Sequence, residues 1–408
     1  MAPPKNQGKN LEAESVLQAV VLADTCVVSN AGVKPVPLTS LQHSTDRVYP
    51  GVPCGCRGAK ESKWSRSYSP LEIITILARE ARSVGDVLRE LDAKQFINSD
   101  FILMSGDVVS NINLEKVLDA HRMRKSTDKN AIMTMVTKEA SPFHRTRAMG
   151  ESSIFVLDAK TNECVHYESV EAFPRKRRMV MSTEVFKKHA DIQIRNDLID
   201  CQIDICSVEV PPLFTENFDY QDIRKDFVYG ILTSELLGKT IYCHVVKDAY
   251  AARVRSLQTY DAISKDVLSR WTYPIVPDNN LQEGDSYEYM RGQIYKERNV
   301  ELSRSCSLGE KVLIGAGTRI AENVKITNSV IDNPFIGPNV EIDGAYIWDG
   351  VKINANCSIF RSILANNVVL EENVIVNKGC LLACDVSEII SSDNLFEKER
   401  SHISCVPM

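Results

Sequence analysis

The sequence predicts two folded parts, an α/β domain built on a parallel sheet and, after it, a left-handed parallel β-helix. Two observations predict this fold class. In the first half, short apolar runs alternate with amphipathic helical patterns. From Val312 to Leu381, an aliphatic residue recurs about every six positions. The 408 residues are enough for two or three domains.

The α/β prediction rests on four strand-like runs and two helical segments between them. Val84–Leu91 places apolar residues at i, i+3, i+4 and i+7, and Asn113–Arg122 is amphipathic in the same way. The strand-like runs are Ala19–Ala23, Ile73–Leu77, Phe101–Asp107 and Ala131–Val136. Nearly continuous apolar strands that alternate with helices are typical of a parallel sheet covered on both faces. Ligands of such sheets bind at the carboxyl ends of the strands, where Asp107 lies.

The β-helix prediction rests on a period that neither a strand nor a helix has. Amphipathic strands repeat every two residues and helices every 3.6, whereas hexapeptide repeats point one aliphatic side chain inward per short strand. Small, Gly or Asn residues separate the aliphatic ones, as in Ile314–Ile320 and Ile336–Ile342. About seventy residues of this pattern predict roughly four coils. The alternative is a β-sandwich with coincidentally spaced aliphatic residues.

The domain boundaries follow from changes in pattern along the chain. The segment Trp271–Asn280 carries two prolines and several Asn and Asp residues, which suits a surface connection. We expect five segments: a disordered N-terminus at 1–13, the α/β domain at 14–275, a linker at 276–305, the β-helix at 306–385, and a frayed tail at 386–408.

Composition argues for a protein of the cytosol. The net charge of −6 gives no reason to expect direct binding to nucleic acid or to an anionic membrane. No apolar run is long enough to span a bilayer, and the polar first ten residues have no signal-peptide core. The 12 cysteines contain no C-x-x-C pair and read as reduced thiols. A zinc cluster of Cys26, Cys54 and Cys56 is the alternative, but its spacing fits no common site.

Several long strings carry a family resemblance. They are Ala81–Asp92, Asp100–Ile112, Asn196–Cys206, Asn217–Gly230, Tyr250–Val254 and Ser269–Pro274. With the layout of an α/β domain followed by hexapeptide repeats, the chain resembles the epsilon subunits of translation initiation factor 2B. The resemblance covers residues 71–381, and it implies that the α/β domain is nucleotidyltransferase-like and Rossmann-like.

The resemblance implies a scaffold and substrate-binding part of the guanine-nucleotide exchange factor for initiation factor 2. The implied partners are the gamma and other subunits of factor 2B and the GDP-bound GTPase, with no membrane and no cofactor. Nucleotide sugar pyrophosphorylases share the layout, so such an enzyme is the alternative function. In the family, exchange catalysis belongs to a C-terminal helical domain, which we expect this 408-residue sequence to lack. The chain is therefore expected to lack exchange catalysis by itself.

The predicted partner-binding residues lie in one short string. In the family, the motif that Asn217 and Phe218 match is implicated in engaging initiation factor 2. Phe218 could anchor in a pocket of the partner, while Asn217 holds backbone groups. Arg224, Asp226 and Phe227 follow at spacings that place some of them near the same surface. The alternative is that Phe218 and Phe227 are ordinary core aromatics.

A degenerate nucleotide site is predicted at Gly85, Asp86, Gly106 and Asp107. Pyrophosphorylases need an Arg-bearing Gly-rich loop for the triphosphate and carboxylates for magnesium. Of these parts, Asp107 alone stands in the expected place, and the carboxylate of Asp86 would repel phosphates. We therefore predict no catalytic residue, no metal ion and no sugar-nucleotide chemistry.

Residues 24–60 depart from the family pattern. The family continues its first strand into an Arg-bearing loop, a Pro-rich turn and a long helix, whereas this stretch has no periodicity. Plausible codons for residues 35–54, read one nucleotide later, can encode that missing segment. The hypothesis is a frameshifted gene model or aberrant transcript, and the alternative is a divergent loop. Sequencing of the cDNA distinguishes them.

Overall fold

The computed structural model describes residues 17–22, 74, 76, 78, 81–141, 144–147, 152–170, 179–234, 236–280, 286–383, 389–390 and 404–405. They divide into two compact units, one with most of the chain up to Arg253 and one with Val109–Asn111 and the chain from Val254 onward. The stretch 24–60, the N-terminus 1–13 and most of the tail 386–408 lie outside the described residues. Of the predicted run Ile73–Leu77, only Ile74 and Ile76 are described.

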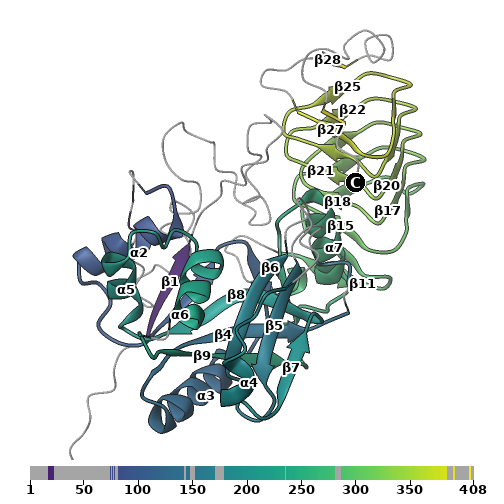
Figure 1. The fold of residues 1–408 in the computed structure, drawn as a ribbon. Coiled ribbons are helices and arrows are strands. Elements are labelled where there is room, and N and C mark those ends of the chain that lie inside the picture. Colours follow the sequence, from purple (N-terminus) through teal and green to yellow (C-terminus); the bar gives the residue numbers. More distant parts are fainter. Residues whose placement is uncertain are drawn as a thin grey trace, which may run out of the picture. The chain divides into compact units, whose positions relative to one another are not determined.

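A five-stranded sheet organises the first unit, in the order β1-β2-β8-β4-β9 (Figure 1). Its strands are β1 (Gln18–Leu22), β2 (Phe101–Ser105), β4 (Ala131–Glu139), β8 (Leu198–Cys206) and β9 (Thr240–Val246). Strand β1 runs parallel to β2, and β4 parallel to β9, as the pattern of apolar runs predicts. The central strand β8 is antiparallel to both of its neighbours, which the sequence analysis did not anticipate.

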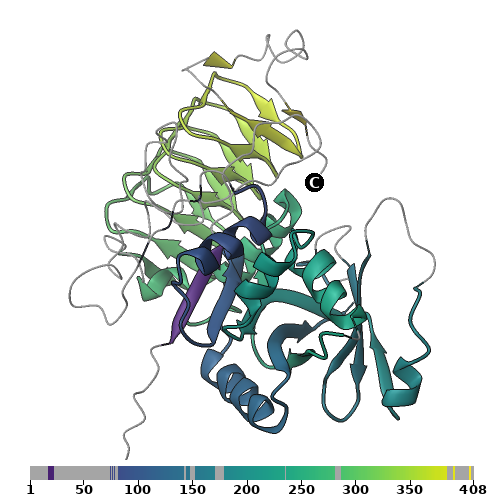
Figure 2. The ribbon, with the colours of Figure 1, turned by 60° about the vertical axis from the view of Figure 1, so that its left-hand side comes forward.

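Helices cover both faces of this sheet, as predicted. Alternate residues of a strand point to opposite faces, so Phe101 and Leu103 pack with one group of helices and Ile102 with another. The first face carries α2 (Val84–Ala93), α5 (Val210–Glu216), the π-helical segment η3 (Ile223–Val228) and α6 (Tyr229–Thr233). The second face carries α3 (Leu114–Thr127). Figure 2 shows α3 apart from the other helices.

Both predicted helices are confirmed, and their ends have physical causes. Ser83 begins α2 as a capping box with Asp86, and Asn113 caps α3 by accepting from the amides of Glu115 and Lys116. The remaining elements are a three-stranded antiparallel sheet, the short helix α4 and a two-stranded sheet. Their bounds are β5 (Ser152–Asp158), β6 (Cys164–Val170), β7 (Ile192–Arg195), α4 (Val185–Lys188), β3 (Val108–Ser110) and β10 (Ala251–Arg253).

The second unit is a three-sided parallel β-solenoid. One side stacks β12 (Ile294–Lys296), β15 (Val312–Ile314), β18 (Val330–Ile331), β21 (Tyr346–Ile347), β24 (Ile363–Leu364) and β27 (Cys380–Leu382). Another stacks β13 (Glu301–Leu302), β16 (Arg319–Ile320), β19 (Phe335–Ile336), β22 (Lys352–Ile353), β25 (Val369–Leu370) and β28 (Ile389–Ile390). The third stacks β14 (Ser307–Leu308), β17 (Lys325–Thr327), β20 (Glu341–Asp343), β23 (Ser358–Phe360) and β26 (Ile375–Val376). β11 (Glu288–Met290) and β29 (Ser404–Cys405) pair antiparallel with β12 and β27.

The inward isoleucines follow the six-residue period that predicted the solenoid. Ile326, Ile342 and Ile359 pair in register on successive coils, and all three are fully buried. The strand β12, which lies within the predicted linker 276–305, already pairs with β15 of the next coil. Five successive parallel pairings on this side extend from β12 to β27. The solenoid therefore has about one coil more than the period suggested.

Asparagines form a ladder at one corner of the solenoid. Asn323, Asn339, Asn356 and Asn373 all have positive φ angles, between 57° and 63°. Each of the first three donates its side-chain amide to the next, over 3.3, 3.2 and 3.2 Å. Asparagine tolerates the left-handed conformation, so the corner turns without a glycine while its side chains tie adjacent coils together.

The helix α7 (Leu257–Leu268) belongs to the solenoid unit, although the sequence analysis assigned it to the α/β domain. Tyr260 lies 4.9 Å from the ring of Tyr346, measured between centroids. The hydroxyl of Tyr346 donates to the carboxylate of Asp261 over 2.9 Å. The contacting residues are more than eighty positions apart in the sequence, so no local sequence pattern predicts these contacts.

Candidate partner-binding site

The predicted motif Asn217–Phe218 lies in a short turn that follows α5. The side chain of Asn217 accepts a hydrogen bond from the amide of Asp219, over 3.1 Å. The side-chain amide of Gln221 donates to the carbonyl of Phe218, over 2.7 Å. Asn217 thus supports the turn through its own backbone, as its residue type favours. We call residues 217–222 the Phe218 loop.

The second half of the Phe218 loop is fixed by two aspartates. Asp222 caps η3 by accepting from the amides of Arg224 and Lys225, over 2.7 and 2.8 Å. The carboxylate of Asp226 reaches back and accepts from the amides of Gln221 and Asp222, over 3.0 and 2.7 Å. The carboxylate of Asp226 is therefore engaged in holding the loop, which limits its use in a direct contact.

Phe218 and Phe227 have opposite environments. The side chain of Phe218 is 70% exposed, whereas Phe227 is fully buried. The ring of Phe227 stacks on that of Phe214, with centroids 4.6 Å apart, and meets Tyr220 edge-on. Of the two aromatics, Phe218 alone is free to meet a partner in this conformation, while Phe227 supports the loop from the core.

Arg224 is buried against two carboxylates of strand β8. Its guanidinium donates to both oxygens of Asp200, over 2.6 and 2.9 Å, and to Asp204, over 2.8 Å. Burial would lower the pKa of Arg224, but Asp200 and Asp204 raise it well above its usual value. Burial raises the pKa of Asp204 to about 6, although Arg224 opposes this shift. Arg224 therefore ties η3 to the sheet rather than facing a partner.

Gly85 and Asp86, predicted as remnants of a nucleotide site, lie against the same loop. The amide of Gly85 donates to the carbonyl of Gln221 over 2.9 Å, and an added Cβ would lie 2.1 Å from the carbonyl oxygen of Tyr220. Only glycine permits this approach. One oxygen of Asp86 accepts from the amides of Arg82 and Ser83, over 3.0 and 3.1 Å.

The other oxygen of Asp86 accepts from the guanidinium of Arg89, over 2.9 Å. Hydrogen bonding from Arg89, with that from the Arg82 amide, lowers the pKa of Asp86 to about 2. The carboxylate of Asp86 is thus committed to holding α2 and Arg89. Two sets of residues that the sequence analysis treated separately therefore meet at the N-terminus of α2.

Gly106 and Asp107 form the turn after β2. The amide of Gly106 donates to the carbonyl of Leu22 over 2.8 Å. Asp107 receives two hydrogen bonds from the guanidinium of Arg253, over 3.1 and 2.9 Å. A bidentate arginine both neutralises a carboxylate and occupies its oxygens. Among the described residues, no group of three or more His, Cys, Asp or Glu side chains is arranged to hold a metal ion.

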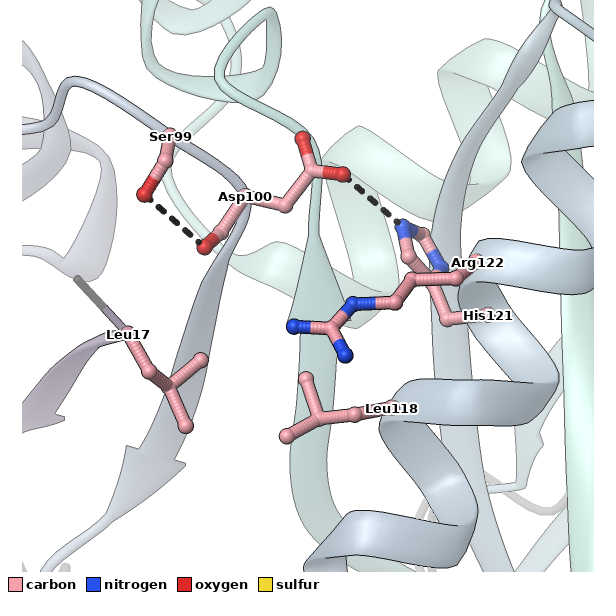
Figure 3. Close-up of a pocket in the computed structure, with 6 residues that line it drawn as sticks. All are labelled: Leu17, Ser99, Asp100, Leu118, His121 and Arg122. Carbon is pink, nitrogen blue, oxygen red and sulfur yellow. Dashed lines mark hydrogen bonds and ion pairs between the residues drawn. The ribbon is translucent and has the colours of Figure 1, made fainter. Parts of the chain in front are cut away.

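A separate pocket of about 260 Å³ lies beside the amino end of β2 (Figure 3). Asp100 and His121 face each other there, 3.7 Å apart, and Arg122 extends over the gap between Leu17 and Leu118. Burial would raise the pKa of Asp100, but His121 and Lys125 outweigh it and lower the pKa to about 2. The pocket holds an ion-pair cluster that joins α3 to the start of β2.

Sequence reasoning missed Arg89, Asp200, Asp204 and Arg253. The signal for the two aspartates was present, because Leu198–Cys206 places charged residues inside a mostly apolar strand. A buried carboxylate requires a counter-charge or a proton. The pattern could not say which of the chain's arginines supplies it.

The fold defines a class of protein, namely one with an α/β domain followed by a hexapeptide-repeat solenoid. A protein-family model described as "EIF2B subunit epsilon LbH domain" matches residues 291–392. The chain is 57% identical over 342 residues to "Translation initiation factor eIF2B subunit epsilon" of Schizosaccharomyces pombe. This match covers 84% of the chain and 50% of the relative.

A second curated relative with the same name comes from Dictyostelium discoideum. It is 41% identical over 326 residues, which cover 75% of this chain and 46% of the relative. Over the matched residues, the chain belongs to the family of eIF2B epsilon subunits. The chain spans about half the length of these curated relatives. In the part of the chain that the structure describes, no helix is long and apolar enough to cross a lipid bilayer.

Proposed function

We propose that this chain is a scaffold and substrate-binding part of the guanine-nucleotide exchange factor that acts on initiation factor 2. The names of its relatives support membership of such a complex. The observation that carries the substrate-binding role is the exposed side chain of Phe218, which is 70% exposed. It lies on a loop that is ordered by internal hydrogen bonds. An exposed aromatic on an ordered loop is the type of residue that anchors protein interfaces.

The proposed partners are the gamma and other subunits of the factor, and GDP-bound initiation factor 2 as the substrate. The proposed compartment is the cytosol, and the role requires no cofactor. Exchange needs no covalent chemistry, because a protein that binds the GTPase better without GDP than with it lowers the affinity for the nucleotide. The Phe218 loop would contribute recognition to this coupling. We assign the expulsion of GDP to a part of the relatives outside the matched half.

The test of this role is a variant with Asn217→Ala and Phe218→Ala. Loss of a well-placed interface anchor costs about 2 kcal/mol, or roughly thirty-fold in affinity. We expect this loss in the dissociation constant for purified initiation factor 2. The melting temperature should fall only slightly, because Phe218 is exposed and Asn217 contributes one hydrogen bond to an exposed turn. Release of labelled GDP should stay at its spontaneous rate with either chain. A double variant that binds normally would contradict the role of the loop.

The alternative function, synthesis of nucleotide sugars, finds no support in the site. Its one carboxylate in the expected position, Asp107, is held by Arg253, and Asp86 is committed to Arg89. We expect no pyrophosphate release from a sugar phosphate, a nucleoside triphosphate and magnesium. A known pyrophosphorylase serves as the positive control. Turnover above the blank that Asp107→Asn abolishes would overturn this expectation.

A further inference from the structure

Arg89 of α2 contacts both ends of the turn that carries Phe218. One terminal nitrogen donates to the carbonyls of Phe214 and Tyr220, over 3.1 and 3.2 Å. The other donates to Asp86, over 2.9 Å. The side chain is 11% exposed, so these bonds form in a largely dry environment. A guanidinium can make three such directed bonds at once because its donors form a rigid fork.

The same guanidinium lies under the ring of Phe218. Its central carbon is 5.2 Å from the ring centroid, within the range of a cation–π interaction. Phe218 is otherwise 70% exposed, and an unsupported exposed aromatic samples several rotamers. Contact with a fixed cation restricts that sampling before any partner arrives. Preordering of an anchor reduces the entropy lost on binding.

Two neighbours of Arg89 on α2 also help to hold the Phe218 loop. Asp86 holds the guanidinium from the helix side, and Gly85 lets the loop approach close enough for its carbonyls to be reached. The amide of Gly85 adds a direct backbone hydrogen bond to Gln221. The N-terminus of α2 therefore forms a platform on which the Phe218 loop rests.

We propose that Arg89 is a positioning residue that presents the ring of Phe218 to initiation factor 2. The proposal rests on the proposed function of the Phe218 loop. It assigns to α2 the task of ordering a protein-binding loop. Arg89 acts through Phe218 and need not touch the partner.

Binding experiments with the 408-residue chain and purified GDP-bound initiation factor 2 test whether Arg89 contributes to affinity through Phe218. Arg89→Met should weaken binding about three- to tenfold, and Arg89→Lys by less, since lysine keeps the charge but not the fork. Adding Arg89→Met to Phe218→Ala should change the affinity no further than Phe218→Ala alone. Independent, multiplying losses would overturn the proposal, because they would show that Arg89 does not act through Phe218.

A partner-free readout separates this proposal from the proposed function. With 4-fluorophenylalanine at position 218, the fluorine resonance of the free chain should move toward that of a mobile ring in Arg89→Met. Lys94→Met is the matched control, because Lys94 is a basic residue of the same region that pairs with Glu90. An unchanged resonance in Arg89→Met would overturn the positioning role. If Phe218→Ala binds normally but the resonance moves, the proposed function fails and presentation to initiation factor 2 fails with it, while the ordering of the ring by Arg89 stands.

Discussion

Arg224→Met is expected to lower the free energy of unfolding of the α/β domain by about 3–5 kcal/mol. The substitution removes the counter-charge of Asp204, which is buried, and of Asp200, whose side chain is only 11% exposed. A buried carboxylate without a counter-charge still bears the full desolvation free energy, and no attraction offsets it. Hydrogen exchange resolved by peptide, together with urea unfolding followed by circular dichroism, measures the loss.

Lys225→Met is the control, because Lys225 is exposed and lies next to Arg224 on η3. It should change the free energy of unfolding by less than about 0.5 kcal/mol. Adding Asp200→Asn and Asp204→Asn to Arg224→Met should recover most of the stability, because no uncompensated charge remains. A triple variant as unstable as Arg224→Met would show that the shape of the guanidinium, and not its charge, is what the fold needs.

The loss should also depend on pH. Burial raises the pKa of Asp204 from 3.8 to about 6, so this group binds its proton more tightly in the folded state. Its stabilising contribution is complete below pH 3.8 and is lost as the pH rises through about 6. Without Arg224, the pKa of Asp204 should rise further. The deficit of Arg224→Met should therefore be larger at pH 8 than at pH 5.

Ile342→Ala is expected to destabilise the solenoid by about 2–5 kcal/mol. Ile342 is fully buried between Ile326 and Ile359, so truncation leaves a cavity that its stacked neighbours cannot fill without breaking strand register. Faster hydrogen exchange should appear in peptides from β17, β20 and β23 and leave the strands of the α/β domain unchanged.

The neighbouring residue Glu341 supplies the matched control. Its side chain points outward and pairs with Lys325 over 2.9 Å, with both groups well exposed. Exposed pairs of this kind contribute about 0–1 kcal/mol. Glu341→Ala should therefore leave exchange in the solenoid almost unchanged. An equal effect of the two substitutions would contradict the inward and outward assignment of the six-residue period.

These two predictions differ in how far the sequence supports them. The inward position of Ile342 follows from the period alone, because every coil repeats the same short-range geometry. The burial of Arg224 does not, since its string reads as an amphipathic helix with several charges. Its partners Asp200 and Asp204 lie more than fifteen positions earlier on another element. A one-dimensional pattern shows that a charge is unusual but not which residue compensates it.

The sequence by itself determined the elements whose cause is local. The helix at Val84–Leu91 and the stacked isoleucines follow from side-chain periodicity, and the strands β1, β2 and β4 follow from short apolar runs. Periodicity reflects which face of an element avoids water, and neighbouring residues suffice to reveal it. The family resemblance added the motif Asn217–Phe218, but not its exposure.

Only the tertiary structure decided which residues of the motif remain available. It separated Phe218 from Phe227, turned Arg224 toward β8, placed β8 antiparallel in the sheet, and brought Arg89 under the ring of Phe218. Each of these outcomes depends on contacts between elements distant in the chain. Their energies arise from burial, counter-charge and close packing, which exist only after the elements have come together.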